Sequence, residues 1–167
     1  MLLCFTTTKI NLNKMSNLKF KNTRFNPATT PFLDIAKQMA KAFGYTADLA
    51  TDRKLAQLLR LRVAQKNECA YCTILHAKTS REIGIPEAKT DNISSWWNSE
   101  LFTEKEKIAL AYCDILTEGS NKNFQKYHDA MTTQFSEKEI AEIAAIVINM
   151  NVWTRLKLAQ GEIPYFE

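Results

Sequence analysis

Apolar residues recur at helical spacing through most of the chain, and local start and stop signals divide this pattern into segments. Thr30 followed by Pro31 is typical of a helix start, and Gly44 is typical of a helix end. Between them lie four apolar residues at intervals of three or four positions: Phe32, Ile35, Met39 and Phe43. The pattern predicts a first helix over residues 31–43.

The next two predicted helices lie on either side of a short turn. A broad apolar stripe covers residues 52–66 and ends at Asn67. Residues 69–83 contain neither glycine nor proline, and Gly84 supplies the stop signal. A second helix over residues 52–66 and a third over residues 69–83 follow from this pattern.

Two capping boxes predict the later helices. In each, a hydroxyl residue precedes Glu by three positions: Thr103 with Glu106, and Ser136 with Glu139. The helices predicted from these starts, with a shorter one between them, cover residues 103–118, 124–134 and 136–158.

No segment alternates polar and apolar residues as a half-buried strand does, so we expect an all-α, single-domain helical bundle. The length of 167 residues suits one domain, and 46% apolar residues suffice for a buried core. Only four glycines and four prolines are present, too few for the many tight turns of an all-β fold.

Residues 1–25 are rich in Asn, Thr and Lys and lack apolar periodicity, so we expect a flexible leader before a domain over residues 26–167. Met15 is an alternative start, and Cys4 in the leader is expected to be a bystander. The first residues lack the charged region and the long apolar core of a signal peptide. We therefore expect a cytoplasmic protein.

The charge balance argues against a nucleic-acid partner. The chain has 22 Lys and Arg against 18 Asp and Glu, and Lys9 and Lys14 supply half of the net charge of +4. The remaining net charge of +2 is too small to indicate a basic surface that binds nucleic acid. No apolar run approaches the ~18 residues of a membrane span, so no membrane partner is expected either.

The candidate chemistry lies at the start of the third predicted helix, where Cys69 and Cys72 form a Cys-x-x-Cys pair and His76 follows four residues later. Positions three and four apart share a helix face, so the sulfurs can form a disulfide and His76 lies one turn from Cys72. Unpaired N–H groups at a helix start favour thiolate. The pair therefore suits reversible oxidation, with His76 as a proton relay.

Other interpretations of the pair stay open. A structural zinc site on Cys69, Cys72 and His76 needs a fourth ligand, and His128 and Cys113 are the only obvious spares. The thiols could also be small core residues without chemistry. Attachment of c-type haem is excluded, because Thr73 stands where that motif needs His. No metal, flavin or haem cofactor is expected.

The chain resembles the AhpD-like alkyl hydroperoxidases of the carboxymuconolactone decarboxylase superfamily. Residues 61–72 read Leu-Arg-Val-Ala-Gln-Lys-Asn-Glu-Cys-Ala-Tyr-Cys, where the family typically reads Leu-Arg-Val-Ala-Gln-x-Asn-Gly-Cys-x-Tyr/His-Cys. Later landmarks follow in the family's order, and the resemblance covers residues 32–158: Trp97, Leu101–Glu106, Phe135–Glu139 and Asn151–Arg155.

This resemblance implies an oligomerising all-helical fold, a homo-oligomer with the cysteine pair near a subunit interface. It implies an antioxidant, peroxiredoxin-type activity that reduces organic hydroperoxides, or partner disulfides such as those of a peroxiredoxin. Cys72 would be the peroxidatic thiol, Cys69 its resolving partner and His76 part of the proton relay. A lipoyl group or a thioredoxin-like protein would be the dithiol reductant. The helix-start argument instead favours Cys69 as the thiolate.

Gln57 departs from the family pattern. The better-characterised peroxidases have a proton-relaying Glu twelve residues before the first cysteine, and this chain has Gln57 there. Gln cannot take up a proton, although it can still hydrogen-bond a water or a thiol. This departure keeps a non-catalytic, redox-sensing helical oligomer open as an alternative, and a decarboxylase of the same superfamily is another.

Overall fold

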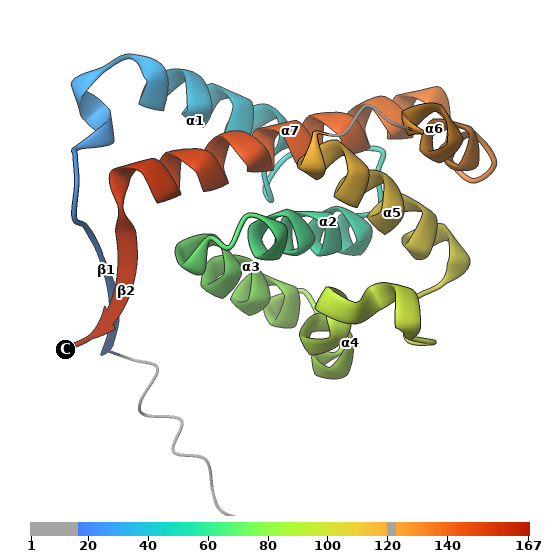
Figure 1. The fold of residues 1–167 in the computed structure, drawn as a ribbon, viewed down its shortest axis with the longest axis horizontal. Helices are drawn as coiled ribbons and strands as arrows, with labels where there is room; N and C mark the ends of the chain where they lie inside the picture. Colours follow the sequence, from blue (N-terminus) through green and yellow to red (C-terminus); the bar gives the residue numbers. More distant parts are fainter. Residues whose placement is uncertain (1–16, 120–122) are drawn as a thin grey trace, which may run out of the picture.

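The computed structural model describes residues 17–119 and 123–167, and helices make up most of them (Figure 1). The α-helices of the described part are α1 (Phe32–Phe43), α2 (Arg53–Lys66), α3 (Ala70–Glu82), α4 (Glu87–Asn92), α5 (Glu104–Glu118), α6 (Phe124–Thr132) and α7 (Glu137–Gln160). Two short 3-10 helices and two strands complete it: Pro27–Thr29, Ile93–Asn98, β1 (Leu18–Asn22) and β2 (Glu162–Phe166). The predicted all-α class is confirmed for the body of the molecule.

Helix α2 is the centre of the fold. It packs against α3, α5 and α7, and Figure 1 shows it between α7 and α3. Its residues from Leu55 to Ala64 are all buried. A helix that is buried on every side must bury its polar residues as well, here Gln57, Arg60 and Arg62. These side chains need polar partners from neighbouring elements.

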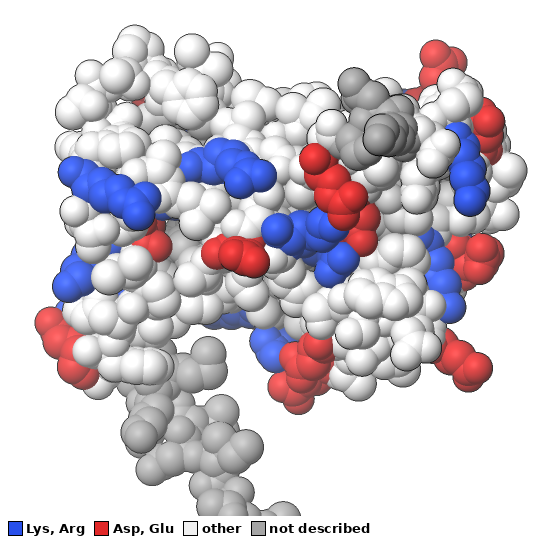
Figure 2. Space-filling view, in the orientation of Figure 1, with Lys and Arg blue, Asp and Glu red and all other residues white. Residues whose placement is uncertain are grey.

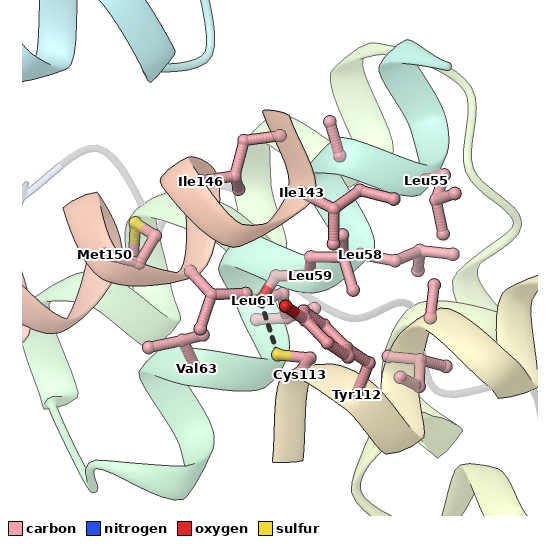
Figure 3. Packing of buried hydrophobic residues seen from close by; sticks show 14 of the residues in the cluster. Leu55, Leu58, Leu59, Leu61, Val63, Tyr112, Cys113, Ile143, Ile146 and Met150 are labelled. Carbon is pink, nitrogen blue, oxygen red and sulfur yellow. Dashed lines mark hydrogen bonds between the residues drawn. The ribbon is translucent and has the colours of Figure 1, made fainter. Parts of the chain in front are cut away.

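Apolar side chains of α2 interleave with those of α5 and α7 in the core (Figure 3). Leu59, Ile143 and Ile146 are 0% exposed, and burying each contributes about 1.5–3 kcal/mol. Cys113 of α5 is equally buried, and its thiol donates to the Leu59 carbonyl oxygen at 3.8 Å. Cys113 is therefore a small core residue.

The predicted capping boxes form at both later helix starts. Thr103 Oγ1 accepts from the Glu106 backbone N–H at 3.2 Å, and the Glu106 carboxylate accepts from the Thr103 N–H at 2.8 Å. Ser136 and Glu139 make the same reciprocal pair at 3.3 and 2.9 Å. Helix α4 and the 3-10 helix after it were not predicted, because six residues are too few for a clear period.

The two strands correct the expectation that no segment forms a strand. β1 and β2 pair antiparallel, with Leu18 opposite Phe166 and Asn22 opposite Glu162. β1 also falls within residues 1–25, where we expected a flexible leader, so that expectation is wrong for residues 18–22. Figure 1 shows the two strands together at one end of the molecule, beyond the end of α7.

The surface in Figure 2 carries acidic and basic side chains interspersed, with no large field of one sign on the face shown. None of the helices in the described ranges is long and apolar enough to cross a membrane. Cys4 and the alternative start Met15 lie outside the described residues.

Candidate active site

A tight turn between α2 and α3 places the cysteine pair. The Cys69 N–H donates to the Ala64 carbonyl at 3.0 Å and the Glu68 N–H donates to the Gln65 carbonyl at 2.9 Å. These are the two bonds of a Schellman motif, which requires a left-handed residue, here Glu68 at φ 53°. Glycine suits this position better, so Glu68 costs about 1 kcal/mol in backbone strain. The turn leaves Cys69 as the N-cap of α3.

Helix α7 holds this turn in place. The side-chain amide of Asn67 donates to Asn151 Oδ1 at 2.7 Å and to Thr154 Oγ1 at 2.8 Å. Asn67 is buried, so these bonds satisfy a group that would otherwise be costly to bury. The position of the cysteine pair is therefore coupled to α7.

The two thiols of the pair are buried and in contact. Their Sγ atoms lie 2.6 Å apart, and Cys69 Sγ also accepts from the Cys72 backbone N–H at 3.4 Å. The side-chain hydrogen bond from Cys72 lowers the pKa of Cys69, although burial opposes this. The same contact, together with burial, raises the pKa of Cys72. Within the pair, Cys69 is therefore the more acidic thiol.

A cavity of about 250 Å³ opens beside the pair. Cys72 lines it and Cys69 does not. The other lining residues come from α1 and the residues after it, α2, α3 and α7: Ala40, Gly44, Tyr45, Arg60, Tyr71, Leu75, His76, Asn149, Met150, Trp153 and Lys157. Acidity therefore favours Cys69 as the nucleophile, whereas access to a substrate favours Cys72.

His76 is held in one tautomer by Gln57. The Gln57 side-chain N–H donates to the His76 carbonyl oxygen at 3.0 Å, and the same Nε2 lies 3.1 Å from His76 Nδ1. A carbonyl oxygen only accepts, so the amide nitrogen must face His76 and also donates to Nδ1. Nδ1 is then unprotonated, and the ring carries its proton on Nε2.

The environment of His76 keeps its ring neutral. Burial, and secondly the positive charge of Arg60, lower the pKa of His76 to about 3. With Nδ1 occupied and Nε2 protonated, the ring has no open lone pair to accept a proton. The ring can only donate a hydrogen bond through Nε2–H, which differs from the proton relay expected from the sequence.

Strand β1 and the junction of α7 with β2 cover the side of the site at Tyr71. Phe20 of β1 packs edge-on against the Tyr71 ring, with 4.7 Å between ring centroids. Lys157 Nζ lies 4.2 Å from the centroid of the Tyr71 ring and 2.6 Å from the Glu162 carboxylate of β2. Lys157 lines the cavity, but Glu162 neutralises its charge.

All four sequence-predicted site residues lie at or beside this cavity, as two contacting pairs: Cys69 with Cys72, and Gln57 with His76. Among the described residues, no hydrogen bond joins His76 to either cysteine, and no cluster of His, Cys, Asp or Glu could hold a metal ion. Sequence reasoning missed Arg60 as a site residue. The sequence feature that could have indicated Arg60 is its position as a charged residue within the apolar stripe over residues 52–66.

Gln57→Glu is expected to raise the pKa of His76, because a carboxylate accepts from Nδ1–H and stabilises the protonated ring. We expect thiol oxidation by hydroperoxide to become about a hundredfold faster, the low end for general acid–base catalysis by a gained proton relay. Imidazole ¹⁵N NMR over a pH titration measures the first effect, and stopped-flow thiol loss the second.

Gln57→Leu is the matched control, since it removes the donor without adding a carboxylate. In Gln57→Leu neither the pKa of His76 nor the rate of thiol oxidation should rise. In the unsubstituted protein the NMR spectrum should show the Nε2–H tautomer at neutral pH. A proton found on Nδ1 would contradict the assigned role of Gln57.

Sequence comparison places the chain among known proteins. The profile of the Carboxymuconolactone decarboxylase family matches residues 34–114, which include Gln57, the cysteine pair and His76. The uncharacterised protein YdfG of Bacillus subtilis is 26% identical over 119 residues, covering 70% of this chain and 80% of that protein.

Solved structures share the fold. A protein of unknown function from Agrobacterium tumefaciens, described as a candidate AhpD antioxidant defence protein, has a TM-score of 0.75 and 25% identity over 82% of this chain and 94% of its own. A peroxidase-related protein from a Silicibacter species has a TM-score of 0.71 and 15% identity, over 80% of this chain and 70% of its own. The debrominase Bmp8 has a TM-score of 0.67 and 18% identity, over 78% of this chain and 69% of its own.

Proposed function

Because the chain belongs to the carboxymuconolactone decarboxylase family, we propose that it is a thiol-dependent oxidoreductase that reduces organic hydroperoxides through Cys69 and Cys72. One observation carries this proposal: two buried thiols lie in contact, and one of them forms part of a cavity wall. A substrate in the cavity meets Cys72, and Cys69 is close enough to close a disulfide.

The reaction begins from the form of the pair in which one proton has gone to solvent and the other resides on Cys69, so that Cys72 is the thiolate. The Cys72 thiolate attacks the terminal oxygen of the hydroperoxide, the O–O bond breaks, and Cys72 becomes a sulfenic acid. The alkoxide that leaves takes the proton of Cys69 and departs as an alcohol. The sulfur is oxidised and the peroxide is reduced.

The Cys69 thiolate then attacks the Cys72 sulfur, the S–O bond breaks, and hydroxide leaves to become water with a proton from solvent. The product is a Cys69–Cys72 disulfide. An external dithiol, a lipoyl group or a thioredoxin-like protein, reduces it by thiol–disulfide exchange. This route needs neither a metal nor a proton-accepting His76, so it is compatible with Gln57.

The donor ability of His76 suits this route. Its Nε2–H can hydrogen-bond a peroxide oxygen in the cavity that His76 and Cys72 both line. Self-association into a homo-oligomer, with the pair near a subunit interface, and a cytoplasmic location remain part of the proposal.

One observation favours a second candidate function, a redox sensor whose disulfide changes its assembly. Gln57 removes the carboxylate relay, and a slow site suits a sensor better than a peroxidase. The two candidates differ in turnover. A sensor oxidises once for each change of state, whereas a peroxidase cycles when a dithiol is present.

A thiol count before and after one equivalent of an organic hydroperoxide tests the proposed function. We expect the loss of two thiols at a rate well above that of a free cysteine, because the thiols are adjacent and the contact with Cys72 lowers the pKa of Cys69. Peptide mapping should locate the new bond between Cys69 and Cys72. Repeated consumption with added dihydrolipoamide supports the peroxidase, and a single oxidation without cycling supports the sensor. Thiols that stay reduced contradict both.

A further inference from the structure

We propose that the cavity beside Cys72 selects substrates that carry a carboxylate, and that Arg60 binds this group. The inference rests on the proposed function for the reaction at Cys72, but it concerns a separate part of the cavity. It assigns a substrate class, compact organic hydroperoxides that are also acids.

Arg60 is a buried charge without an acidic partner. It is 3% exposed, and its Nη2 donates to the backbone carbonyls of Phe43 at 3.0 Å and Gly44 at 2.8 Å. Its Nε–H has no hydrogen-bond partner among the described residues, and no Asp or Glu in those ranges forms an ion pair with it. Burial lowers the pKa of Arg60 to about 10, which still leaves the group charged at neutral pH.

Arg62, two residues later, is a buried arginine whose charge is paired within the protein itself. Its Nε and Nη2 donate to the two carboxylate oxygens of Asp114 at 2.6 and 2.7 Å. Arg60 lacks such a partner and lies in the cavity wall instead. Burying an unpaired charge costs free energy. An anion that pairs with Arg60 would offset this cost and should therefore bind favourably.

Two other polar groups of the same wall have an atom without a partner in the described part of the chain. Trp153 Nε1 is a second donor, and Asn149 Oδ1 is an acceptor on a residue that is 2% exposed. Two N–H donors can bind the oxygens of a carboxylate, and the amide oxygen can accept from a hydroperoxide O–H. All three residues line the cavity that Cys72 lines, and the unpartnered atoms themselves are buried in its wall.

The charge and size of the cavity agree with this substrate class. Its lining contains Arg60 and Lys157 and no acidic residue, and Lys157 is already neutralised by Glu162. The net charge of the wall is therefore positive, from Arg60. A volume of about 250 Å³ is below the roughly 300–1,000 Å³ usual for ligand pockets, which favours a compact acid.

The test compares 4-(2-hydroperoxypropan-2-yl)benzoate with its methyl ester, which differs only in the charge and bulk of the acid group. We expect the acid to oxidise the cysteine pair at least tenfold faster than the ester in stopped-flow thiol measurements. In Arg60→Met the ratio of the two rates should fall toward one. Arg155→Met removes an exposed charge from α7, outside the cavity, and should keep the ratio.

A binding measurement separates this inference from the proposed function. The alcohol 4-(2-hydroxypropan-2-yl)benzoate cannot react, and calorimetry should show that it binds at least tenfold more tightly than its methyl ester. Binding of this acid without any thiol oxidation by the hydroperoxide would support the inference and refute the peroxidase. Equal oxidation by acid and ester, with no binding of the alcohol, would overturn the inference and leave the peroxidase standing.

Trp153→Phe guards against an Arg60 variant that fails to fold. It removes one N–H and keeps most of the ring volume, so it should reduce the acid-to-ester ratio by several-fold without unfolding the protein. An unchanged ratio in a folded Trp153→Phe variant, together with an unchanged ratio in a folded Arg60→Met variant, would contradict a carboxylate site on this wall.

Discussion

Cys72→Ser is expected to abolish the consumption of organic hydroperoxide, with a loss of about a thousandfold or more, because the substituted hydroxyl cannot replace a thiolate nucleophile. Cys72 is the member of the pair that forms part of the cavity wall. Cys69→Ser should leave one stoichiometric oxidation at Cys72, because the sulfenic acid forms but no disulfide follows. Peroxide consumption per protein and mass spectrometry of the Cys72 peptide measure both results.

Cys113→Ala is the matched control for the loss of a thiol. Cys113 lies in the core against Leu59, away from the cavity lining, so this variant should retain turnover after allowance for any loss of stability. The opposite pattern is also informative. A single oxidation that survives in Cys72→Ser and disappears in Cys69→Ser would show that the more acidic thiol attacks, as the helix start alone suggests.

The second large effect is a loss of stability in acid that depends on His76. The unfolded chain protonates this residue near its ordinary pKa of 6.5, whereas the folded protein does so only near pH 3. Between these values the unfolded state binds one more proton, so the free energy of unfolding falls as the pH falls. The contribution is fully present above pH 6.5, and about 3 kcal/mol of it is lost by pH 4.

Denaturant unfolding of the protein and of His76→Gln at pH 7 and pH 4 measures this contribution. Carboxylates titrate in the same range in both proteins, so the difference between their pH profiles isolates His76. His128→Gln removes the other histidine of the chain and should leave the acid loss unchanged. A profile for His76→Gln that parallels the unsubstituted protein would show that His76 is not held neutral in the fold.

The helices were predictable because their signals are local. Thr103 with Glu106 and Ser136 with Glu139 satisfy each other within one turn, so the sequence alone contains the interaction. The strands were not predictable, because each has only five residues and gains its pairing from the far end of the chain. Phe20 lies opposite Pro164, and a proline argues against a strand until its neighbour is known.

The candidate site likewise has features that the local sequence predicts and features that depend on contacts between helices. The spacing of Cys69, Cys72 and His76 indicated one helix face, and the resemblance singled out Gln57. The contact of Gln57 with Nδ1 of His76 joins α2 to α3, and it reverses the expected proton chemistry of the ring. No local pattern contains that contact. The open donor of Arg60 likewise depends on the placement of the acids on neighbouring helices, since none in the described ranges forms an ion pair with it.

The pairing of β1 with β2 has a consequence for the order in which the site is built. The two strands are separated by almost the whole chain, and contacts of such high contact order form late, after the intervening helices have removed most of the entropy of closing the loop. The helices around α2 can assemble from shorter-range contacts before β2 is available. Phe20 therefore reaches Tyr71 only when β2 has been synthesised and paired with β1. The helix that carries the cysteines forms early, and its cover is completed at the end of folding.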